Sequence, residues 1–149
     1  MKLSHLDAEG RARMVDVGDK PVSDRRAVAT GAVRMSRKAY ELVAGDGVPK
    51  GDVLAVAEVA GVMGAKRTGE LIPLCHPLPL SHVEVSVEVG ADGVEITAVA
   101  EATAQTGVEM EALTAVSVAA LTVYDMAKAI DKAMSVTEIT LIEKTKEPV

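Results

Sequence analysis

The sequence is almost free of aromatic side chains. Its 149 residues include no Trp and no Phe, and its two tyrosines are Tyr40 and Tyr124. Without the roughly 150–250 Å² that each aromatic side chain buries, the core must be built from small aliphatic residues. Alanine and valine, with 23 copies of each, are the source of these residues. The composition predicts closely packed elements, and it argues against the aromatic stacking platforms that hold single-stranded nucleic acid.

Positive charge is also in short supply. Lysine and arginine number 16 against 22 aspartates and glutamates, which gives a formal net charge of −6. A nucleic-acid backbone requires a basic stripe on the protein surface, and no such stripe dominates this sequence. We therefore expect no nucleic-acid partner. An anionic ligand would have to be met by a local basic site within an acidic protein.

Cysteine, export signals and long apolar runs are scarce too. The single Cys75 rules out an internal disulfide and fits a reducing compartment. Residues 1–9 carry charges throughout, unlike a signal peptide. The longest weakly charged stretch, 53–65, is about 13 residues long, short of the roughly 20 that span a membrane. We expect a cytoplasmic protein with no membrane partner.

No low-complexity linker divides the chain, so residues 1–149 are expected to form one domain. Within it, residues 1–25 would form an N-terminal arm or strand and a loop, and residues 145–149 a short tail. Hydrophobic periodicity predicts strands over 27–35, 81–89, 94–104 and 135–143. Helices are expected over 36–44, over 53–65 and from 106 to about 132. This order predicts an α+β, ferredoxin-like split βαβ sandwich, in which helices pack on one face of an antiparallel sheet.

Several local signals refine this expectation. Ser36 and Asp52 are candidate helix caps, and Thr106 with Glu109 has the spacing of a capping box. Residues 14–18 are either an edge strand or an ordered arm. The helix over 53–65 is apolar nearly all round, which predicts that a neighbouring subunit covers it or that it is sandwiched deeply. The long helix has one apolar seam, formed by Leu113, Val116, Ala120, Val123, Ala127 and Ile130.

Phosphate-binding loops, dinucleotide fingerprints, a serine elbow and metal-ligand spacing are all missing. What remains is a set of polar residues in apolar surroundings. His76, in a stiff loop between Pro73 and Pro77, is either an acid, base or phosphate donor or a structural hydrogen-bonding group. Its neighbour Cys75 is more typical of a small buried hydrophobe.

Charged residues of the long helix form a second candidate. Asp125 and Lys128, three residues apart, are either a surface ion pair or an acid–base pair. Glu109 and Glu111 near the helix start either stabilise its dipole or bind a ligand. Glu111 and Asp125 lie about 21 Å apart along the helix, so they cannot meet within it, although its two ends can serve one cleft across a subunit interface. Four further candidates are cations, each of which is individually typical of a solvated side chain: Arg25, Lys50, Lys66 and Arg67. Together with Lys128 they would suit a polyphosphate.

These motifs closely resemble the MoaC family of molybdenum cofactor biosynthesis, the cyclic pyranopterin monophosphate synthases. The resemblance runs in register from about Leu3 to Lys144. Its longest matching segments are 60–68 (Ala-Gly-Val-Met-Gly-Ala-Lys-Arg-Thr), 71–78 (Leu-Ile-Pro-Leu-Cys-His-Pro-Leu), 106–114 (Thr-Gly-Val-Glu-Met-Glu-Ala-Leu-Thr) and 118–129 (Val-Ala-Ala-Leu-Thr-Val-Tyr-Asp-Met-Ala-Lys-Ala). Many members carry Cys where this chain has Ala127, and many continue into a Gly-rich, basic tail.

The resemblance implies a lyase that converts 3′,8-cyclo-7,8-dihydro-GTP to cyclic pyranopterin monophosphate and releases pyrophosphate. It implies no metal and no redox cofactor for this step. It also implies a hexamer of three dimers, with active sites at the dimer interface. The residues it places at catalysis are Asp125, Lys128, Lys50 and His76. Those it places around the substrate are Leu74, Cys75, His76, Glu109, Met110, Glu111, Arg25 and Lys66.

Two rival hypotheses stand beside this one. The first is a non-catalytic ligand-binding or protein-interaction module, because a fold alone does not define a function. The second is a hydrolase using Cys75 and His76, which is disfavoured because adjacent residues of an extended segment point apart. The scarcity of aromatics adds an expectation for the synthase: a flat substrate ring would be held by Met110, the 74–76 loop and hydrogen bonds.

Overall fold

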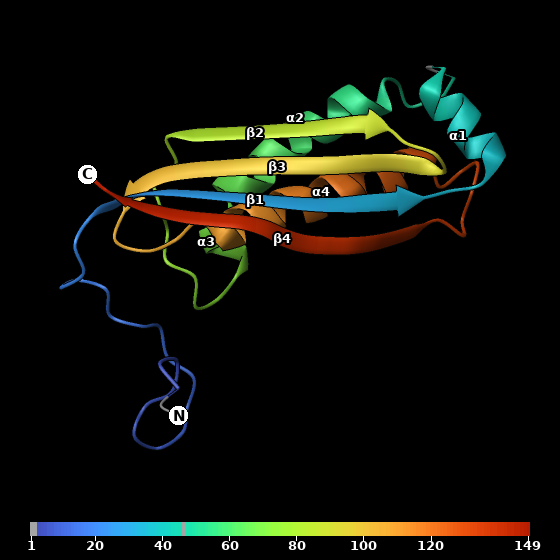
Figure 1. Ribbon diagram of the computed structural model, residues 1–149. Helices are drawn as coiled ribbons and strands as arrows, with labels where there is room; N and C mark the ends of the chain where they lie inside the picture. The colour runs from blue at the N-terminus through green and yellow to red at the C-terminus, as the bar shows by residue number, and fades with distance from the viewer. Residues whose placement is uncertain (1–2, 46) are drawn as a thin grey trace.

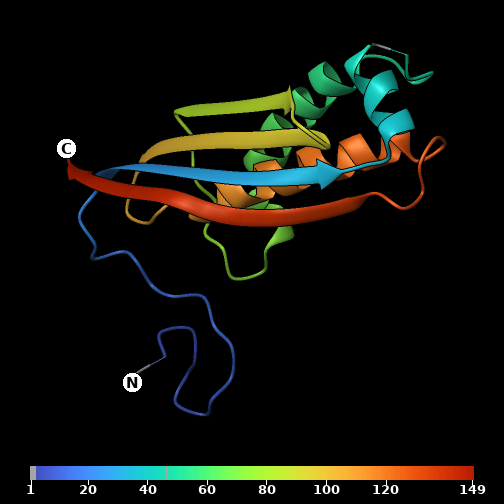
Figure 2. The ribbon, with the colours of Figure 1, turned by 45° about the vertical axis from the view of Figure 1, so that its right-hand side comes forward.

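A four-stranded antiparallel sheet organises the protein in the computed structural model, which describes residues 3–45 and 47–149. The strands are β1 (Ser23–Arg34), β2 (His82–Val89), β3 (Gly93–Ala104) and β4 (Ser135–Pro148), and their order in the sheet is β2-β3-β1-β4. The helices are α1 (Arg37–Ala44), α2 (Val53–Lys66), α3 (Thr68–Leu71) and α4 (Glu109–Ala127). The helices α2 and α4 lie on one face of the sheet (Figures 1 and 2). The expected ferredoxin-like α+β fold is confirmed.

Small residues on the covered face of the sheet allow the helices to come close. In the central strands, Ala27 pairs with Ala100 and Ala29 with Ala98, and all four are buried. At Gly31 of β1, an added Cβ would lie 2.6 Å from Cγ1 of Val116 on α4. A larger side chain there would therefore push α4 away from the sheet.

The contact between α2 and α4 follows the same rule. A Cβ added at Gly61 would lie 3.0 Å from the Ala115 main-chain oxygen, and one added at Gly64 would lie 2.8 Å from Val118 Cγ2. The excess of small residues thus serves close packing of helix on helix and helix on sheet. By length and hydropathy alone α4 would also pass as a membrane-spanning segment, but its packing on the sheet identifies it as a core helix.

The helix caps show which local predictions hold. Ser36 accepts a hydrogen bond from the Ala39 N–H at 3.2 Å and Asp52 accepts one from the Ala55 N–H at 3.1 Å, so both predicted caps are confirmed. The predicted capping box is wrong, because α4 begins at Glu109 and its N-cap residue, Val108, makes no side-chain cap bond. The Glu109 carboxylate instead pairs with Lys144 of β4 at 3.3 Å.

The predicted end of α4 near residue 132 is also wrong, because the helix stops at Ala127. The chain turns there, and the Asp131 carboxylate accepts hydrogen bonds from the main-chain N–H groups of Ser36 (2.7 Å) and Ala133 (2.9 Å). These bonds hold the pKa of Asp131 below its usual value. These hydrogen bonds to the N-cap of α1 stabilise the non-helical turn after Ala127, so α4 does not continue for another helical turn.

The neighbouring strands β1 and β4 extend beyond their predicted limits. β1 begins at Ser23 and β4 runs to Pro148, and these two residues pair with each other. On α2, three large apolar side chains, Val56, Val59 and Met63, are exposed in the single chain. The prediction that this helix is deeply sandwiched within the chain is therefore wrong. Its coverage by a neighbouring subunit stays a prediction.

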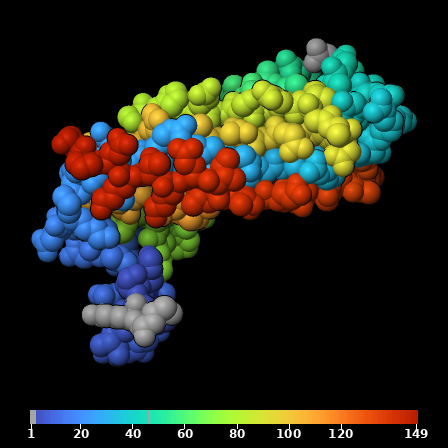
Figure 3. Space-filling view, viewed as in Figure 1, coloured from blue at the N-terminus to red at the C-terminus, as the bar shows by residue number. Residues whose placement is uncertain are grey.

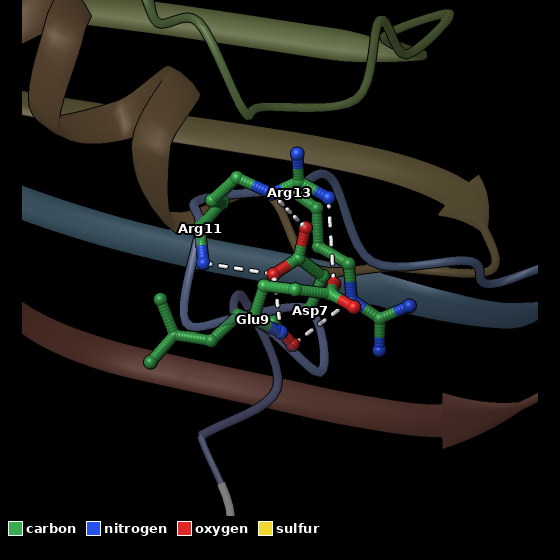
Figure 4. A network of polar contacts seen from close by, with 5 residues as sticks. Asp7, Glu9, Arg11 and Arg13 are labelled. Atoms are coloured by element: carbon green, nitrogen blue, oxygen red, sulfur yellow. Dashed lines mark hydrogen bonds and ion pairs between the residues drawn. The ribbon is translucent and has the colours of Figure 1, made fainter.

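The described residues before β1 form an arm, and residues 14–18 contain no strand. The arm begins as a small hairpin with a bridge between Leu6 and Ala12. Inside this hairpin the Asp7 carboxylate accepts hydrogen bonds from the N–H groups of Glu9 (3.0 Å) and Arg11 (2.8 Å) and pairs with the Arg11 guanidinium (Figure 4). The space-filling view shows the hairpin projecting from the end of the sheet where β4 finishes (Figure 3).

Candidate functional site

One group of charged side chains lies at the C-terminal end of α4. Lys50, in the loop before α2, and Lys128, just after α4, flank the carboxylate of Asp125. Lys128 Nζ lies 3.0 Å from Asp125 Oδ1, and Lys50 Nζ lies 3.4 Å from Oδ2. Lys50 also donates a hydrogen bond of 3.0 Å to the main-chain oxygen of Asp125. We call these three residues the Asp125 cluster.

The Asp125 cluster is open to solvent and keeps its carboxylate ionised. The hydrogen bond from Lys128 and the positive charge of Lys50 hold the pKa of Asp125 below its usual value. About half of each side chain is exposed, so the pairs contribute little to stability. The arrangement presents a carboxylate base between two ammonium groups, and these ammonium groups can bind phosphate oxygens.

A cavity of about 430 Å³ lies near the opposite end of α4. Its walls come from three segments: the N-terminal arm, the loop after α3 and the start of α4. Five residues that the sequence analysis named as candidates line the cavity from the loop and the helix: Leu74, Cys75, His76, Glu109 and Met110. We call this cavity the Cys75 pocket.

Glu111 lies directly behind Cys75. Its side chain is buried, with 3% of the residue exposed, and the Cys75 thiol donates to its Oε1 over 3.7 Å. Burial raises the pKa of Glu111, and the nearby Glu109 raises it further. A carboxyl group in such surroundings takes up a proton more readily than a solvated one and can act as a general acid.

The same burial weakens Cys75 as a nucleophile. Desolvation first and the Glu111 carboxylate second raise the pKa of the thiol to about 11. The thiol is therefore protonated near neutral pH, whereas a nucleophilic cysteine needs a lowered pKa. This environment argues against the hydrolase hypothesis.

His76 is held by the arm. Its Nε2 lies within hydrogen-bonding distance of the Val15 main-chain oxygen. A carbonyl oxygen only accepts hydrogen bonds, so Nε2 must carry a proton, and in the neutral form of the ring the acceptor would be Nδ1. The arm thus selects the tautomer of His76.

Two buried carboxylate oxygens near the pocket have no hydrogen-bond partner within the described part of the chain: Oε2 of Glu109 and Oε2 of Glu111. Buried polar atoms are rarely left without partners, because each loses its hydration. Acceptors in this state fit a ligand that brings N–H groups. No group of three or more His, Cys, Asp or Glu side chains among residues 3–45 and 47–149 is arranged to hold a metal.

The remaining three candidates, Arg25, Lys66 and Arg67, lie elsewhere, and Arg67 is the C-cap residue of α2. Arg25, on β1, donates to the Gln105 main-chain oxygen at 3.3 Å, and its buried Nε has no partner among the described residues. Lys66 ends α2 and lines a different hollow, together with Leu78 and His82. A single chain therefore forms the Asp125 cluster and the Cys75 pocket as two separate groups. Arg25 and Lys66 belong to neither.

The separation of the two groups is set by α4 itself. This helix carries Glu111 in its first turn and Asp125 in its last. At 1.5 Å per residue the two positions are about 21 Å apart along the axis. The two groups of one chain therefore cannot contact one small ligand together.

Reasoning from sequence missed several residues of the pocket. His5 and Lys20 line it from the arm, and Gln105 and Lys144 contact the arm and Glu109. Nothing in the sequence pattern of the arm indicates that the arm contacts the loop after α3. Lys144 had a weak signal, because Lys144 and Lys146 lie at alternate positions of one strand and thus share a face.

Together the fold and these polar groups define a ferredoxin-like α+β protein with a candidate ligand site of ionisable residues at each end of α4. Comparison with known sequences gives the family: the MoaC family model matches residues 14–147. The chain belongs to the MoaC family.

Curated relatives agree over nearly the whole chain. A protein of Dinoroseobacter shibae named cyclic pyranopterin monophosphate synthase is 59% identical over 144 residues, covering 95% of this chain and 91% of the relative. Proteins of the same name from Chloroflexus aggregans and Streptomyces griseus are 60% and 58% identical, covering 96% and 97% of this chain and 88% and 81% of the relatives.

Proposed function

We propose that this protein is a cyclic pyranopterin monophosphate synthase of molybdenum cofactor biosynthesis. It would convert 3′,8-cyclo-7,8-dihydro-GTP to cyclic pyranopterin monophosphate and release pyrophosphate. The observation that carries the proposal is the similarity, over nearly the whole chain, to relatives of that name. The geometry of the two groups on α4 supports it.

The Cys75 pocket suits the heterocycle of this substrate. Its volume of about 430 Å³ lies within the range of small-molecule sites, which is about 300–1,000 Å³. Glu109, which lines the pocket and has an unpartnered carboxylate oxygen, would accept a hydrogen bond from an N–H group of an aminopyrimidine ring. Met110 and Leu74 provide apolar contacts, and His76 with Glu111 would move protons during ring opening and reclosure.

The Asp125 cluster suits proton transfer next to a phosphate chain. In the proposed cyclisation a sugar hydroxyl oxygen forms a bond to the α-phosphorus, and the bond from that phosphorus to the pyrophosphate oxygen breaks. Asp125 would accept the hydroxyl proton, while Lys50 and Lys128 meet the charge that develops on the departing pyrophosphate. Arg25 and Lys66 would add positive charge around the phosphates. The step needs no redox cofactor, because no atom changes oxidation state.

Since one chain keeps the two groups about 21 Å apart, we propose that each active site combines the Asp125 cluster of one subunit with the Cys75 pocket of its neighbour. A two-fold dimer would then hold two such sites. The exposed Val56, Val59 and Met63 of α2 provide an apolar surface for further assembly into a hexamer of three dimers. A cytoplasmic location is part of the same proposal.

The decisive experiment is incubation with 3′,8-cyclo-7,8-dihydro-GTP while pyrophosphate release is followed. The proposal predicts one pyrophosphate for each cyclic pyranopterin monophosphate formed. Binding of the substrate without release would instead support the non-catalytic module. Release by the wild type that is fully retained in Lys50→Ala would overturn the assignment of the site.

A further inference from the structure

The side-chain amide of Gln105 connects the N-terminal arm to the body of the protein. Gln105 lies between β3 and α4, and its Nε2 donates hydrogen bonds of 3.1 Å to the main-chain oxygens of Gly18 and Lys20. Both partners are carbonyl oxygens, which only accept hydrogen bonds. The amide nitrogen must therefore face the arm, with each of its two hydrogens used.

The segment that Gln105 holds is a tight turn. The Lys20 N–H donates to the Val17 oxygen at 3.0 Å, and the Asp16 carboxylate accepts from the Gly18 N–H at 2.9 Å. This turn presents the oxygens of Gly18 and Lys20 to one amide group. Gln105 is itself fixed, because its main-chain oxygen accepts the bond from Arg25 of β1.

Few other polar contacts hold the arm. Within residues 3–45 and 47–149, three hydrogen bonds join the arm to the rest of the protein: the two from Gln105 and the one between His76 and Val15. The bonds of Asp7 and Arg11 are internal to the arm hairpin and do not attach it.

The arm segment next to this turn is a wall of the Cys75 pocket. Val15, Val17 and Lys20 line the pocket beside His76. A second cavity of about 340 Å³ is lined by Val17, His76 and Gln105 itself, so Val17 of the arm and His76 border both spaces. Release of the turn would open this wall and remove the carbonyl that selects the tautomer of His76.

We propose that Gln105 is a positioning residue, which holds the arm against the Cys75 pocket and thereby sets substrate affinity. This inference rests on the proposed function. Loss of the two hydrogen bonds lowers the fraction of molecules with an intact wall, and the apparent dissociation constant rises in inverse proportion to that fraction. Saturating substrate restores the wall by mass action, so KM changes more than kcat.

Three substitutions at Gln105 separate the effect of its hydrogen-bond donors from the effects of side-chain charge and shape. Gln105→Glu keeps the shape and loses both donors, and Gln105→Met is neutral, similar in length and also without donors. Gln105→Lys keeps donors, because an ammonium group can bond both carbonyls. Ser86→Ala, at a half-buried position on β2, is the matched control.

The first measurement is hydrogen exchange of the peptide covering residues 14–22, in full-length protein with its oligomeric state verified. Gln105→Glu and Gln105→Met should exchange about tenfold faster than wild type, the change expected from two lost hydrogen bonds. Gln105→Lys and Ser86→Ala should match wild type. Wild-type exchange in Gln105→Met, or a Gln105→Lys protein as fast as Gln105→Glu, would overturn the proposal.

The second measurement is the kinetics of pyrophosphate release. Gln105→Glu and Gln105→Met should raise KM, by up to about tenfold, and change kcat much less. Faster exchange with unchanged KM would show a purely structural contact and overturn the positioning role. If the wild type released no pyrophosphate, the proposed function would fail, while hydrogen exchange would still decide whether Gln105 holds the arm.

Discussion

The two ends of α4 carry carboxyl groups in opposite surroundings. At the C-terminal end Asp125 is 59% exposed in its side chain, lies between two lysines and has a lowered pKa. Near the N-terminal end Glu111 is buried against Cys75 and has a raised pKa. Environments that push two pKa values apart divide the work between a base and an acid. Under the proposed function, Asp125 would therefore accept a proton and Glu111 would donate one.

The largest effect should follow from removing the base. Asp125→Asn should lower kcat about 10²–10⁴-fold, the usual contribution of a general acid or base. Its fold and oligomeric state should not change, because the exposed ion pairs contribute little to stability. Pyrophosphate release, circular dichroism and size-exclusion chromatography measure these outcomes. An Asp125→Asn protein with wild-type turnover would contradict the assignment.

The second prediction concerns stability as a function of pH. Glu111 has a raised pKa in the folded state, so its protonated form favours folding below its ordinary pKa and this advantage disappears as pH rises. Glu111→Gln should therefore melt higher than wild type at pH 7, and the two should converge below about pH 4.

Asp125→Asn should show the opposite sign. Asp125 has a lowered pKa, so its stabilisation exists at neutral pH and is lost in acid. This variant should melt at or slightly below the wild-type temperature at pH 7, with the difference vanishing in acid. Melting curves that shift in the same direction for both variants would contradict the comparison of the two ends.

The smallest effect is expected at Cys75. Since its thiol has a pKa near 11, alkylation by iodoacetamide should be slow at pH 7 and should accelerate toward that value. Cys75→Ser should keep most of the activity, because a hydroxyl can still donate to Glu111. Rapid alkylation at neutral pH together with an inactive Cys75→Ser protein would restore the hydrolase hypothesis.

Much of the fold was predictable from the sequence, because period-two alternation and cap residues are local signals. The four strands and the caps at Ser36 and Asp52 follow from such signals. The capping box failed because spacing alone could not show that Lys144 of a distant strand binds Glu109. The extra length of β1 and β4 depends on their pairing with each other, which is likewise non-local.

The candidate site, like the fold, was predictable where its contacts are local in sequence. The pair of Asp125 and Lys128 follows from a three-residue spacing on a helix, whereas the contact of Lys50 with Asp125 depends on how α2 packs beside α4. No periodic pattern in the sequence indicates that the arm lines the Cys75 pocket. His5, Lys20 and the contact made by Gln105 required the folded chain.

The central claim is that one active site uses the Asp125 cluster of one subunit and the Cys75 pocket of another. The direct test mixes Asp125→Asn and Glu111→Gln proteins under conditions that exchange subunits; we expect each variant to lose most of its activity when alone. Each mixed dimer would hold one site with both changes and one with neither. Random pairing in a two-fold dimer should then restore about a quarter of wild-type pyrophosphate release. Confirmed subunit exchange without any recovered activity would contradict the claim.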